Sequence, residues 1–570
     1  MTLKRRRLKS DLPEQATFAA RASAPRAAAP APTDSAAAAG ADSDEGNGAG
    51  SGAAMPAAEA ALRQAESLTA AEAARRQTER TSTTKRRLQR RVTPLDILQQ
   101  PLLLASRKVF DLRRFLIVIG LTVIVLLLPT PAGLSEQGHR ALALFVFTGA
   151  ILALEPAPLP ISALLVPVAL VALGIDTVSG AFAPFGSPSV FLILTSLFLA
   201  EALRKHGLTR RLALHAIVLS GGQLPMLCLS LMLLTALLGM WVMNTATTAV
   251  LLPVALTIAQ RMPTAEDGRR ALPLLVLAVA YGASIGGLAT IVGSGENAIA
   301  AGVINQVQPF GFMEWMKYGL PVACLLLPFS WWLLRRANPT PHVRLDTSTV
   351  ETEIARSGPL TSAEREILVV MAVAVFLWVT GEQVERLLGL PPTMLSSVIV
   401  AIGAVAYLSF EGIVDWNDMK GVNWGVFLVI GAGFALGSAL DATGANAWIA
   451  QLAQPVLQPL PFAVTLLIVI VAGFALTQVI NDVTLGAIFS PILVALTQAI
   501  DIPPARLVVP TIIAVGLAYM LPSASARMAL VAVTGAVERK QMVRTGIIVG
   551  IPSMVVVYLF FLLLTWAGWI

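Results

Sequence analysis

Two short polar motifs interrupt apolar stretches of this chain. The first, MNTATT, occupies residues 243–248, and the second, INDVT, occupies residues 480–484. Asparagine offers both a hydrogen-bond donor and an acceptor, and threonine adds a hydroxyl. Neutral polar side chains and free helix N-termini suit an anion, whereas carbonyl oxygens at helix C-termini suit small cations. The residue types therefore predict a binding site for an anion that is accompanied by charge-balancing cations.

The apolar residues around each motif indicate how it is positioned. We expect two helical hairpins, at 225–260 and 462–500, with one polar motif at each tip. Two apolar spans are interrupted as well, by SIGGLATIVGSGEN at 284–297 and by LPSASAR at 521–527. Backbone that leaves a helix at membrane depth is tolerated only where it is buried in protein or lines a cavity. These segments therefore predict a binding site, and polar contacts between buried helices are the structural alternative.

The composition indicates a polytopic membrane protein. Of the 570 residues, 56% are hydrophobic and 13% are charged, and the mean hydropathy is +0.73. Stretches such as 115–128 and 553–566 carry no charge and approach the roughly 20 residues that span a bilayer. Because the alternating pattern of a β-barrel is absent, we expect an all-α fold. We attribute the net charge of +7 to basic residues in the cytoplasmic loops, and no nucleic-acid partner is expected.

The apolar pattern predicts about eleven transmembrane helices plus two re-entrant hairpins. Residues 1–110 are basic and rich in Ala and Pro, so we expect a disordered cytoplasmic tail. Residues 111–340 form a first half with a leading helix, 341–362 a cytoplasmic linker, and 363–570 a second half. The expected spans are 115–133, 138–156, 160–176, 189–204, 271–303, 315–335, 364–383, 391–409, 424–441, 506–535 and 543–568.

The basic residues predict the orientation of these spans. Clusters of Lys and Arg occur at 204–211, 260–270, 335–344 and 538–544. On the expected span count they all lie on the same side as the basic tail, which agrees with the positive-inside rule. We therefore expect an integral protein of the bacterial inner membrane, with a cytoplasmic amino terminus and an external carboxyl terminus.

The two halves repeat the same order of segments. Phe191 and Phe427 are 236 residues apart, Asn244 and Asn481 are 237 apart, and a Tyr pair at 281 and 519 is 238 apart. Because an odd number of spans separates the copies, the second copy must be inverted in the membrane. Inverted repeats with broken segments at matching places are typical of secondary transporters with a binding site near the membrane midplane.

At these residues the chain resembles the divalent anion:sodium symporter family, the carriers of di- and tricarboxylates and sulfate. The resemblance covers roughly 131–570 and includes LEPAPLPISALL at 154–165 and ASIGGLATIVGS at 283–294. It implies a homodimer in which a scaffold domain supports a transport domain that moves like an elevator. It also implies a small anionic substrate, membrane lipid as surroundings, no cofactor, and sodium as a possible coupling ion.

The resemblance also implies roles for particular residues. Two sets are expected to hold cations: a first cation position of Asn244, Gly286 and Gly293, and a second cation position of Thr477, Asn481 and Ala524. The expected substrate-binding residues are Asn244, Thr245, Asn481, Asp482, Ser525 and Arg527. No catalytic residue and no metal other than sodium are expected.

Several residues depart from the family pattern. Met243 and Ile480 replace the serines of the two Ser-Asn-Thr motifs. Glu296, Asp482 and Arg527 place ionisable groups where the pattern is neutral, and a lone charge at membrane depth is costly.

Three functional hypotheses follow for these charges. Arg527 pairs with Asp482 and replaces the second sodium ion; Asp482 or Glu296 carries a proton; or Arg527 binds a substrate carboxylate in a bidentate contact. The structural alternative is that Glu296 and Arg527 are solvated or paired near loop ends.

The sequence thus predicts a secondary active transporter for small divalent organic anions, such as C4-dicarboxylates, with sodium symport or antiport. A sulfate carrier and a proton-coupled ion transporter of the same superfamily are the alternatives. A membrane enzyme is disfavoured because the spans show no cluster of His, Asp and Glu and no nucleotide motif. A channel and an anion sensor of the same fold remain further alternatives.

Overall fold

The computed structural model describes residues 110–340, 343–422 and 424–569. Within these ranges the chain forms α-helices, one short 3-10 helix and an isolated β-bridge, so the all-α prediction is confirmed there. The tail predicted at 1–110 lies outside the described residues, apart from residue 110. The helices up to residue 340 are α3 (Leu112–Leu127), α4 (Glu136–Leu154), α5 (Leu159–Ala172), α6 (Val178–Phe182), α7 (Pro188–Lys205), α8 (Leu208–Leu219), α9 (Leu224–Trp241), α10 (Asn244–Gln260), α11 (Ala265–Leu288), α12 (Gly295–Val307) and α13 (Phe312–Ala337).

The helices after residue 340 follow a similar order. They are α14 (Ser348–Ser357), α15 (Ser362–Leu388), α16 (Ser397–Phe410), α17 (Trp416–Lys420), α18 (Trp424–Ala442), α19 (Ala445–Leu457), α20 (Phe462–Thr477), α21 (Asp482–Ala499), α22 (Ala505–Val515), α23 (Ala526–Val533) and α24 (Arg539–Trp566).

Local sequence signals mark the helix boundaries. α7 begins at Pro188, directly after Ser187, whose hydroxyl accepts a hydrogen bond from the first turn. α15 begins with a capping box, in which Thr361 and Glu364 each accept a hydrogen bond from the other's backbone N–H. The same helix ends at Gly389, whose φ of 65° is the left-handed conformation that glycine adopts without strain.

By length and composition, eight helices of the described residues can cross a membrane, or up to nine if one bent pair counts as one span. Four further apolar helices are shorter: α5, α16, α20 and α22. Two of the eight, α9 and α21, fall inside the expected hairpins. The predicted number of eleven spans and the re-entrant path of the hairpins therefore stay predictions.

Two helix pairs and two broken helices position the polar motifs. α9 and α10 meet at residues 242–243, and α20 and α21 meet at 478–481. The chain leaves the helical path at 289–294, between α11 and α12, and at 516–525, between α22 and α23. Each interruption predicted from the glycines and prolines is thus a break between two helices in the structure.

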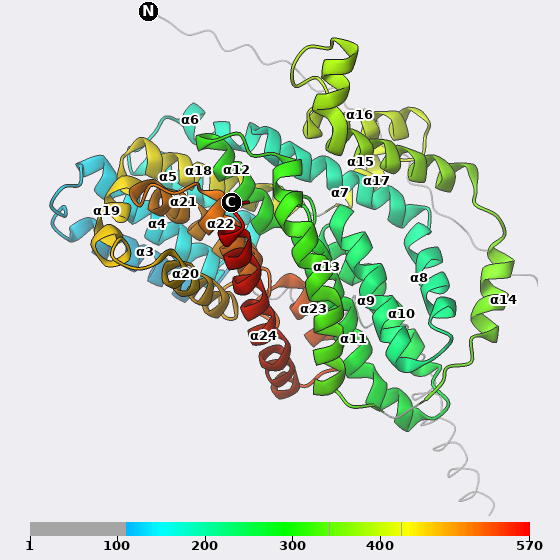
Figure 1. The fold of residues 1–570 in the computed structure, drawn as a ribbon. Helices are drawn as coiled ribbons and strands as arrows, with labels where there is room; N and C mark the ends of the chain where they lie inside the picture. The colour runs from blue at the N-terminus through cyan, green and yellow to red at the C-terminus, as the bar shows by residue number, and fades with distance from the viewer. Residues whose placement is uncertain (1–109, 341–342, 423, 570) are drawn as a thin grey trace, which may run out of the picture. The chain divides into compact units, whose positions relative to one another are not determined.

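The helix pairs pack against the broken helices. α9 and α10 both lie along α11, α20 lies against α22, and α12 lies against α21. The carboxyl-terminal helix α24 runs beside α13, so that the last helix of each half is a neighbour of the other (Figure 1). These contacts bring the turn of each pair next to a break.

The predicted linker at 341–362 contains a helix. α14 packs against α8, and Gln223 forms an antiparallel β-bridge with Arg344. The described part of this segment is therefore attached to the helices of the first half rather than extended away from them.

Candidate functional site

The turn between α9 and α10 is fastened to the break after α11. The backbone N–H of Asn244 donates to the carbonyl oxygen of Gly293 at 2.9 Å, and its side-chain amide donates to the Ser294 hydroxyl at 3.1 Å. The hydroxyl of Thr245 donates to Asn244 Oδ1 at 3.2 Å. Two residues expected at the first cation position, Asn244 and Gly293, are therefore in direct contact.

The break itself is held by side chains that the sequence analysis did not single out. The Asn297 amide donates to the carbonyl oxygens of Gly287 at 2.8 Å and Thr290 at 2.9 Å. The Thr290 hydroxyl donates to the Met240 carbonyl at 2.5 Å. Because these bonds are made to backbone oxygens, they fix the path of residues 287–293 whatever side chains the loop carries.

Glycines allow this close approach of backbone segments. A Cβ atom added to Gly286 would clash with the Ala236 carbonyl, and one added to Gly293 would lie 2.6 Å from the Cα atom of Gly287. Both glycines are expected members of the first cation position, and the structure gives them a packing role at the same place.

The turn between α20 and α21 is fastened in a matching way. Asn481 caps α21, its Oδ1 accepting from the N–H of Val483 at 3.1 Å. The next residue, Asp482, donates its N–H to the carbonyl oxygen of Ala524 at 2.9 Å. Ser525 then caps α23 by accepting from the N–H of Met528 at 3.3 Å.

The structure shifts the predicted register of the two motifs by one residue. Met243 is the N-cap of α10 and Asn481 is the N-cap of α21, with similar backbone angles. The first N–H of each helix, from Asn244 and from Asp482, bonds to the neighbouring break. The structural counterpart of Asn244 is therefore Asp482, not Asn481 as the matching spacing of the two halves predicted.

A buried glutamine holds the second break. The Gln478 side chain accepts from the N–H groups of Tyr519 at 3.2 Å and Met520 at 3.1 Å, and it donates to the Leu517 carbonyl at 3.2 Å. The sequence analysis assigned this residue no role. The one feature of the sequence that could have indicated this role is the position of a polar glutamine in an apolar segment, close to the INDVT motif.

The three ionisable residues predicted to be unusual all lie in the interior. Glu296 and Arg527 are each 1% exposed and Asp482 is 3% exposed, so neither Glu296 nor Arg527 is solvated. Arg527 Nη1 lies 2.9 Å from Asp482 Oδ2, and Nη2 donates to the Gly516 carbonyl at 2.7 Å. The predicted pair between Arg527 and Asp482 is present. Both carboxylate oxygens of Glu296 lack a hydrogen-bond partner among the described residues.

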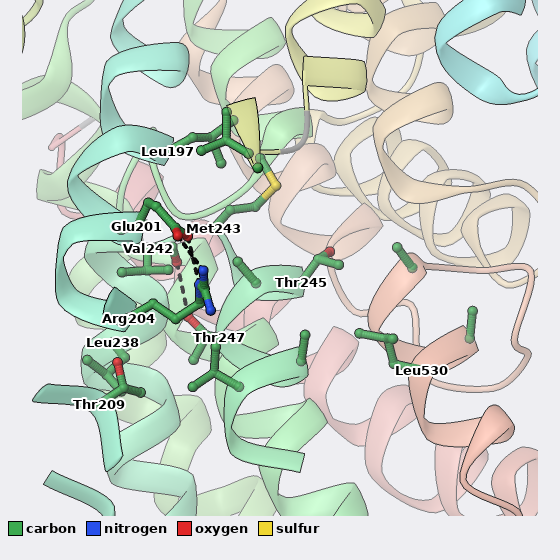
Figure 2. A pocket seen from close by; sticks show the side chains of 18 of the residues that line it. Leu197, Glu201, Arg204, Thr209, Leu238, Val242, Met243, Thr245, Thr247 and Leu530 are labelled. Atoms are coloured by element: carbon green, nitrogen blue, oxygen red, sulfur yellow. Dashed lines mark hydrogen bonds and ion pairs between the residues drawn. The ribbon is translucent and has the colours of Figure 1, made fainter. Parts of the chain in front are cut away.

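A pocket of about 470 Å³ opens beside the first turn. Thr245 lies on one wall and α23, with Ala526 and Leu530, lies on another (Figure 2). An ion pair between Arg204 and Glu201 of α7 lies on the facing wall. The pocket therefore combines apolar walls with a hydroxyl near one turn and a guanidinium on α7.

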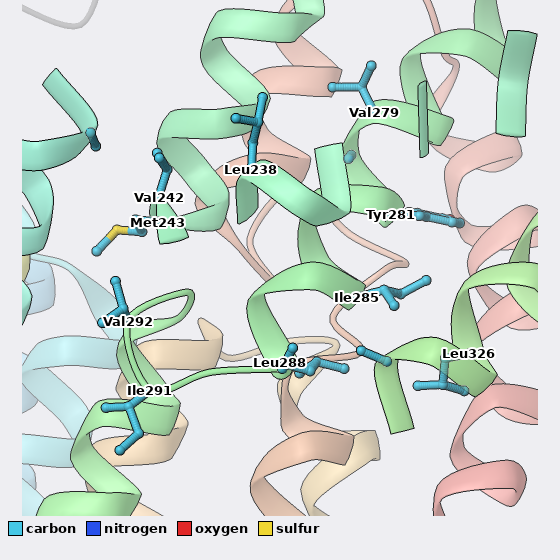
Figure 3. Close-up of a cluster of buried hydrophobic side chains, with 14 of the residues drawn as sticks. Leu238, Val242, Met243, Val279, Tyr281, Ile285, Leu288, Ile291, Val292 and Leu326 are labelled. Carbon is cyan, nitrogen blue, oxygen red and sulfur yellow. The ribbon is translucent and has the colours of Figure 1, made fainter. Parts of the chain in front are cut away.

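An apolar cluster supports the turn, whose residues Val242 and Met243 also line the pocket. Val242 and Met243 of the turn share a buried cluster with Ile291 and Val292 of the break (Figure 3). Met243 is 7% exposed, so the residue that replaces the motif serine packs in the interior. The departure from the family pattern at this position therefore adds apolar packing and removes a hydroxyl.

The expected site residues divide into two groups. Of the expected residues, Thr245 lines the pocket. Ala526, which lies between Ser525 and Arg527 in the sequence, lines it as well. The others do not line this pocket and lie in the hydrogen-bonded junctions between turn and break: Asn244, Gly286, Gly293, Asn481, Asp482, Ala524, Ser525 and Arg527. The Thr477 hydroxyl is fully buried and has no partner among the described residues.

The donor atoms at the two cation positions differ in charge. At the first position the available groups are neutral oxygens, and the buried Oδ1 of Asn297 nearby has no partner among the described residues. Neutral oxygen donors suit a hard monovalent cation. At the second position the Arg527 guanidinium is held against Asp482, beside the Ala524 carbonyl. The guanidinium already occupies the Asp482 carboxylate, so no uncompensated negative charge is left there to attract a second cation.

Comparison with known proteins places this geometry in a family. The family model of the sodium:sulfate symporter transmembrane region matches residues 110–570. An uncharacterized transporter of Haemophilus influenzae is 30% identical over 439 residues, which cover 75% of this chain and 93% of that protein. The sodium-dependent dicarboxylate transporter SdcS of Staphylococcus saprophyticus is 29% identical over 464 residues, covering 77% and 88% respectively. The solved structure of MtrF from Neisseria gonorrhoeae aligns with a TM-score of 0.49 at 14% identity, covering 78% of this chain and 94% of that one.

Proposed function

The chain belongs to the sodium:sulfate symporter family, and we propose that it carries C4-dicarboxylates or similar small divalent organic anions across the bacterial inner membrane. Its relatives are membrane transporters, and the chain is an integral membrane transporter rather than an enzyme. SdcS is named as a sodium-dependent dicarboxylate transporter, which supports this substrate class.

The observation that carries the proposal is the pocket beside the first turn. Thr245, whose hydroxyl can exchange its bond to Asn244 Oδ1 for one to a carboxylate, lies at the N-terminus of α10, where the partial positive charge of the helix favours an anion. The opposite wall carries Arg204, whose present partner is Glu201 on the same helix. A pocket with a neutral donor at one side and a cation at the other suits an anion with two charged ends separated by methylenes.

Two ring contacts support the proposed inverted repeat. Tyr281 and Tyr519, which occupy matching places in the two halves, stack with ring centroids 4.1 Å apart. Phe191 and Phe427, another matching pair, meet edge to face at 6.1 Å. Residues related by a two-fold axis touch each other only near that axis. We therefore propose inverted repeats whose two-fold axis passes close to both ring pairs.

We further propose the transport cycle of the family for this chain. In that cycle α9–α12 and α20–α23 form a transport domain that moves like an elevator against a scaffold, and the protein is a homodimer in lipid. The helix pairs are re-entrant hairpins, the amino terminus is cytoplasmic and the carboxyl terminus is external. The matched junctions between each turn and each break support one mobile unit, because hydrogen bonds tie them together.

We propose sodium as a coupling ion at the first cation position. The neutral oxygens of Asn244 and Gly293 would contribute there, with Gly286 allowing the close approach of α9. At the second position the Arg527 guanidinium takes the place of an ion. The transporter would then bind fewer sodium ions than a family member whose two motifs carry only neutral side chains.

Anion exchange without a net ion gradient is the second candidate for coupling. It is favoured by the Arg527 guanidinium, which is held by Asp482 at the place where a second coupling ion would otherwise bind. A sulfate carrier is a second candidate for substrate, since the family model is named for sulfate.

The experiment that tests the proposal is uptake of labelled succinate into proteoliposomes, with and without an inward sodium gradient. Acceleration by the gradient would support sodium symport. Uptake that needs only internal succinate would support exchange. Uptake of labelled sulfate but not succinate would replace the proposed substrate class.

A further inference from the structure

Glu296 is a buried carboxyl group beside the ion pair of Arg527 and Asp482. It is the second residue of α12 and is 1% exposed. Neither of its carboxylate oxygens has a hydrogen-bond partner among the described residues, although both are fully enclosed. An ionised carboxylate that accepts no hydrogen bond in the interior is strongly unfavourable, whereas a protonated one is neutral.

The ionisable groups nearest to Glu296 come from the second half. α21 contributes Asp482 and α23 contributes Arg527, and these two form their own ion pair. Tyr519, in the segment after α22, is engaged elsewhere, because its ring stacks on Tyr281 of α11. Arg527 Nε lacks a partner among the described residues, but the ion pair already neutralises the guanidinium charge.

The other helices that pack against α12 carry ionisable groups engaged elsewhere. On α7, Arg204 pairs with Glu201, and Lys205 pairs with an aspartate of α17. On α18, Asp441 accepts from an asparagine of α19. On α22, Arg506 lies ten residues before Gly516, which corresponds to about 15 Å along a helix. None of the ionisable groups described on these helices therefore neutralises Glu296.

The buried centre accordingly holds two carboxyl groups and one guanidinium. Because Asp482 and Arg527 compensate each other, the charge of the centre depends on Glu296 alone. We propose that Glu296 binds and releases one proton in each transport cycle and thereby couples proton movement to anion movement. This inference rests on the proposed function and adds a second coupling ion to it.

A proton fits the space around Glu296 better than a sodium ion. A Cβ atom added to Gly486 would lie 2.6 Å from the Glu296 Cβ atom, and one added to Gly516 would lie 3.3 Å from Oε1. The Gly516 carbonyl oxygen already accepts from Arg527 and from Ser284. A sodium ion would need several oxygen ligands beside a fixed guanidinium, whereas a proton needs only the carboxylate oxygen.

The position of Glu296 links it to the anion site. Glu296 and Arg527 each lie two residues after a serine N-cap, Ser294 and Ser525, so they are counterparts in the two halves. Ala526, directly before Arg527, lines the pocket. A proton that enters from the pocket would pass the ion pair, form an O–H bond on a carboxylate oxygen of Glu296, and return to water when that bond breaks on the other side.

The charge balance of transport follows from this assignment. The two charges of a dicarboxylate would be offset by one sodium ion at the first cation position and one proton on Glu296. Arg527 and Asp482 would remain a neutral pair throughout. Net transport of the dianion would then move no charge across the membrane.

The test begins with the unmodified protein in proteoliposomes that contain a pH-sensitive dye, with equal sodium on both sides. Addition of external succinate should acidify the interior while labelled succinate enters. Entry of succinate without acidification would overturn the proton assignment and leave the proposed function standing. Failure of succinate to enter under any gradient would overturn the proposed function, and this inference with it.

Substitutions then test whether Glu296 is the proton site. Glu296→Gln should lower succinate-driven acidification to the rate of protein-free vesicles while exchange of internal for external succinate continues. The control Asp441→Asn, which neutralises a carboxyl group at the end of α18 away from the ion pair, should leave both signals unchanged. Protons carried on succinate itself need no carboxyl group of the protein, so wild-type acidification in Glu296→Gln would overturn the assignment.

A second substitution covers the possibility that Glu296→Gln does not fold. Glu296→Asp keeps a titratable carboxyl group but withdraws it by one methylene. It should retain acidification with a shifted pH profile of uptake, since the surroundings of the carboxyl group change. An unshifted profile would contradict the assignment.

Discussion

The guanidinium of Arg527 lies 2.9 Å from a carboxylate oxygen of Asp482, and their side chains are 1% and 4% exposed. This ion pair joins the first turn of α23 to the first residue of α21, and therefore joins a break to a helix-pair turn. The equivalent junction in the first half is made by neutral groups, Asn244 and Ser294. The two halves thus use different chemistry for the same connection.

Removal of one member of the buried pair should destabilise the protein more than removal of both. Arg527→Met leaves Asp482 as an unpaired buried charge, and breaking such a pair typically costs about 3–5 kcal/mol. The double substitution Arg527→Met with Asp482→Asn should recover much of that loss, because neither charge remains. Thermal unfolding of the purified protein in detergent measures the difference.

An exposed ion pair provides the control for this experiment. Arg386→Met removes one member of the pair with Glu382, whose side chains are 78% and 79% exposed. Its unfolding temperature should stay close to that of the wild type, because exposed pairs contribute little. Equal losses for the single and double substitutions at the buried pair would contradict the energetic coupling of the two charges.

Thr245 should contribute a hydrogen bond to the substrate. Thr245→Val keeps the shape of the side chain and removes the hydroxyl that faces the pocket, so KM for succinate should rise about tenfold, which corresponds to one lost hydrogen bond. Thr248→Val is the matched control, because the Thr248 hydroxyl donates to the Asn244 carbonyl within α10 and does not line the pocket. Similar KM values for the Thr245 variant and the wild type would remove this residue from the site.

Gly286 should not tolerate a side chain. Gly286→Ala places a Cβ atom against the Ala236 carbonyl and should separate α11 from α9, which lowers both the unfolding temperature and the uptake rate. Gly120→Ala is the control, since nothing lies within 4 Å of the added atom in α3. Alanine at Gly120 should be neutral or slightly stabilising. Wild-type uptake by Gly286→Ala would contradict the close approach of these helices.

We expect sodium to stimulate succinate uptake by binding at a single position, the first cation position. Asn244→Ala should raise the sodium concentration for half-maximal succinate uptake by about tenfold, because it removes an oxygen ligand and the bond to Ser294. The wild-type dependence on sodium should be hyperbolic, since Arg527 replaces the second ion. Cooperative sodium dependence in the wild type would show that a second sodium ion binds despite Arg527.

The sequence predicted the places where apolar helices are interrupted, because short local motifs mark them. Glycine and proline runs located both breaks, and the polar motifs located both turns. The one-residue register error arose because Asn481 and Asp482 are adjacent polar residues, and either could align with Asn244. Only the backbone bond from Asp482 to Ala524 distinguishes them.

Other features of the site depend on contacts between distant segments. Gln478 is bonded to residues about 40 positions away, and no local pattern reports that. The burial of Glu296 depends on the packing of α12 against α21. The short helix α14 in the expected linker was missed because its ten residues carry a polar composition that also suits a loop.

Counterflow tests the central claim, carriage of dicarboxylates, most directly, because it requires no assumption about the coupling ion. Proteoliposomes are loaded with unlabelled succinate and diluted into a trace of labelled succinate, with equal sodium and pH on both sides. We predict transient accumulation of label above the level in protein-free vesicles, and its loss when internal succinate is omitted. Label that equilibrates without accumulating would indicate a channel, and no entry of label with either succinate or sulfate inside would contradict the account.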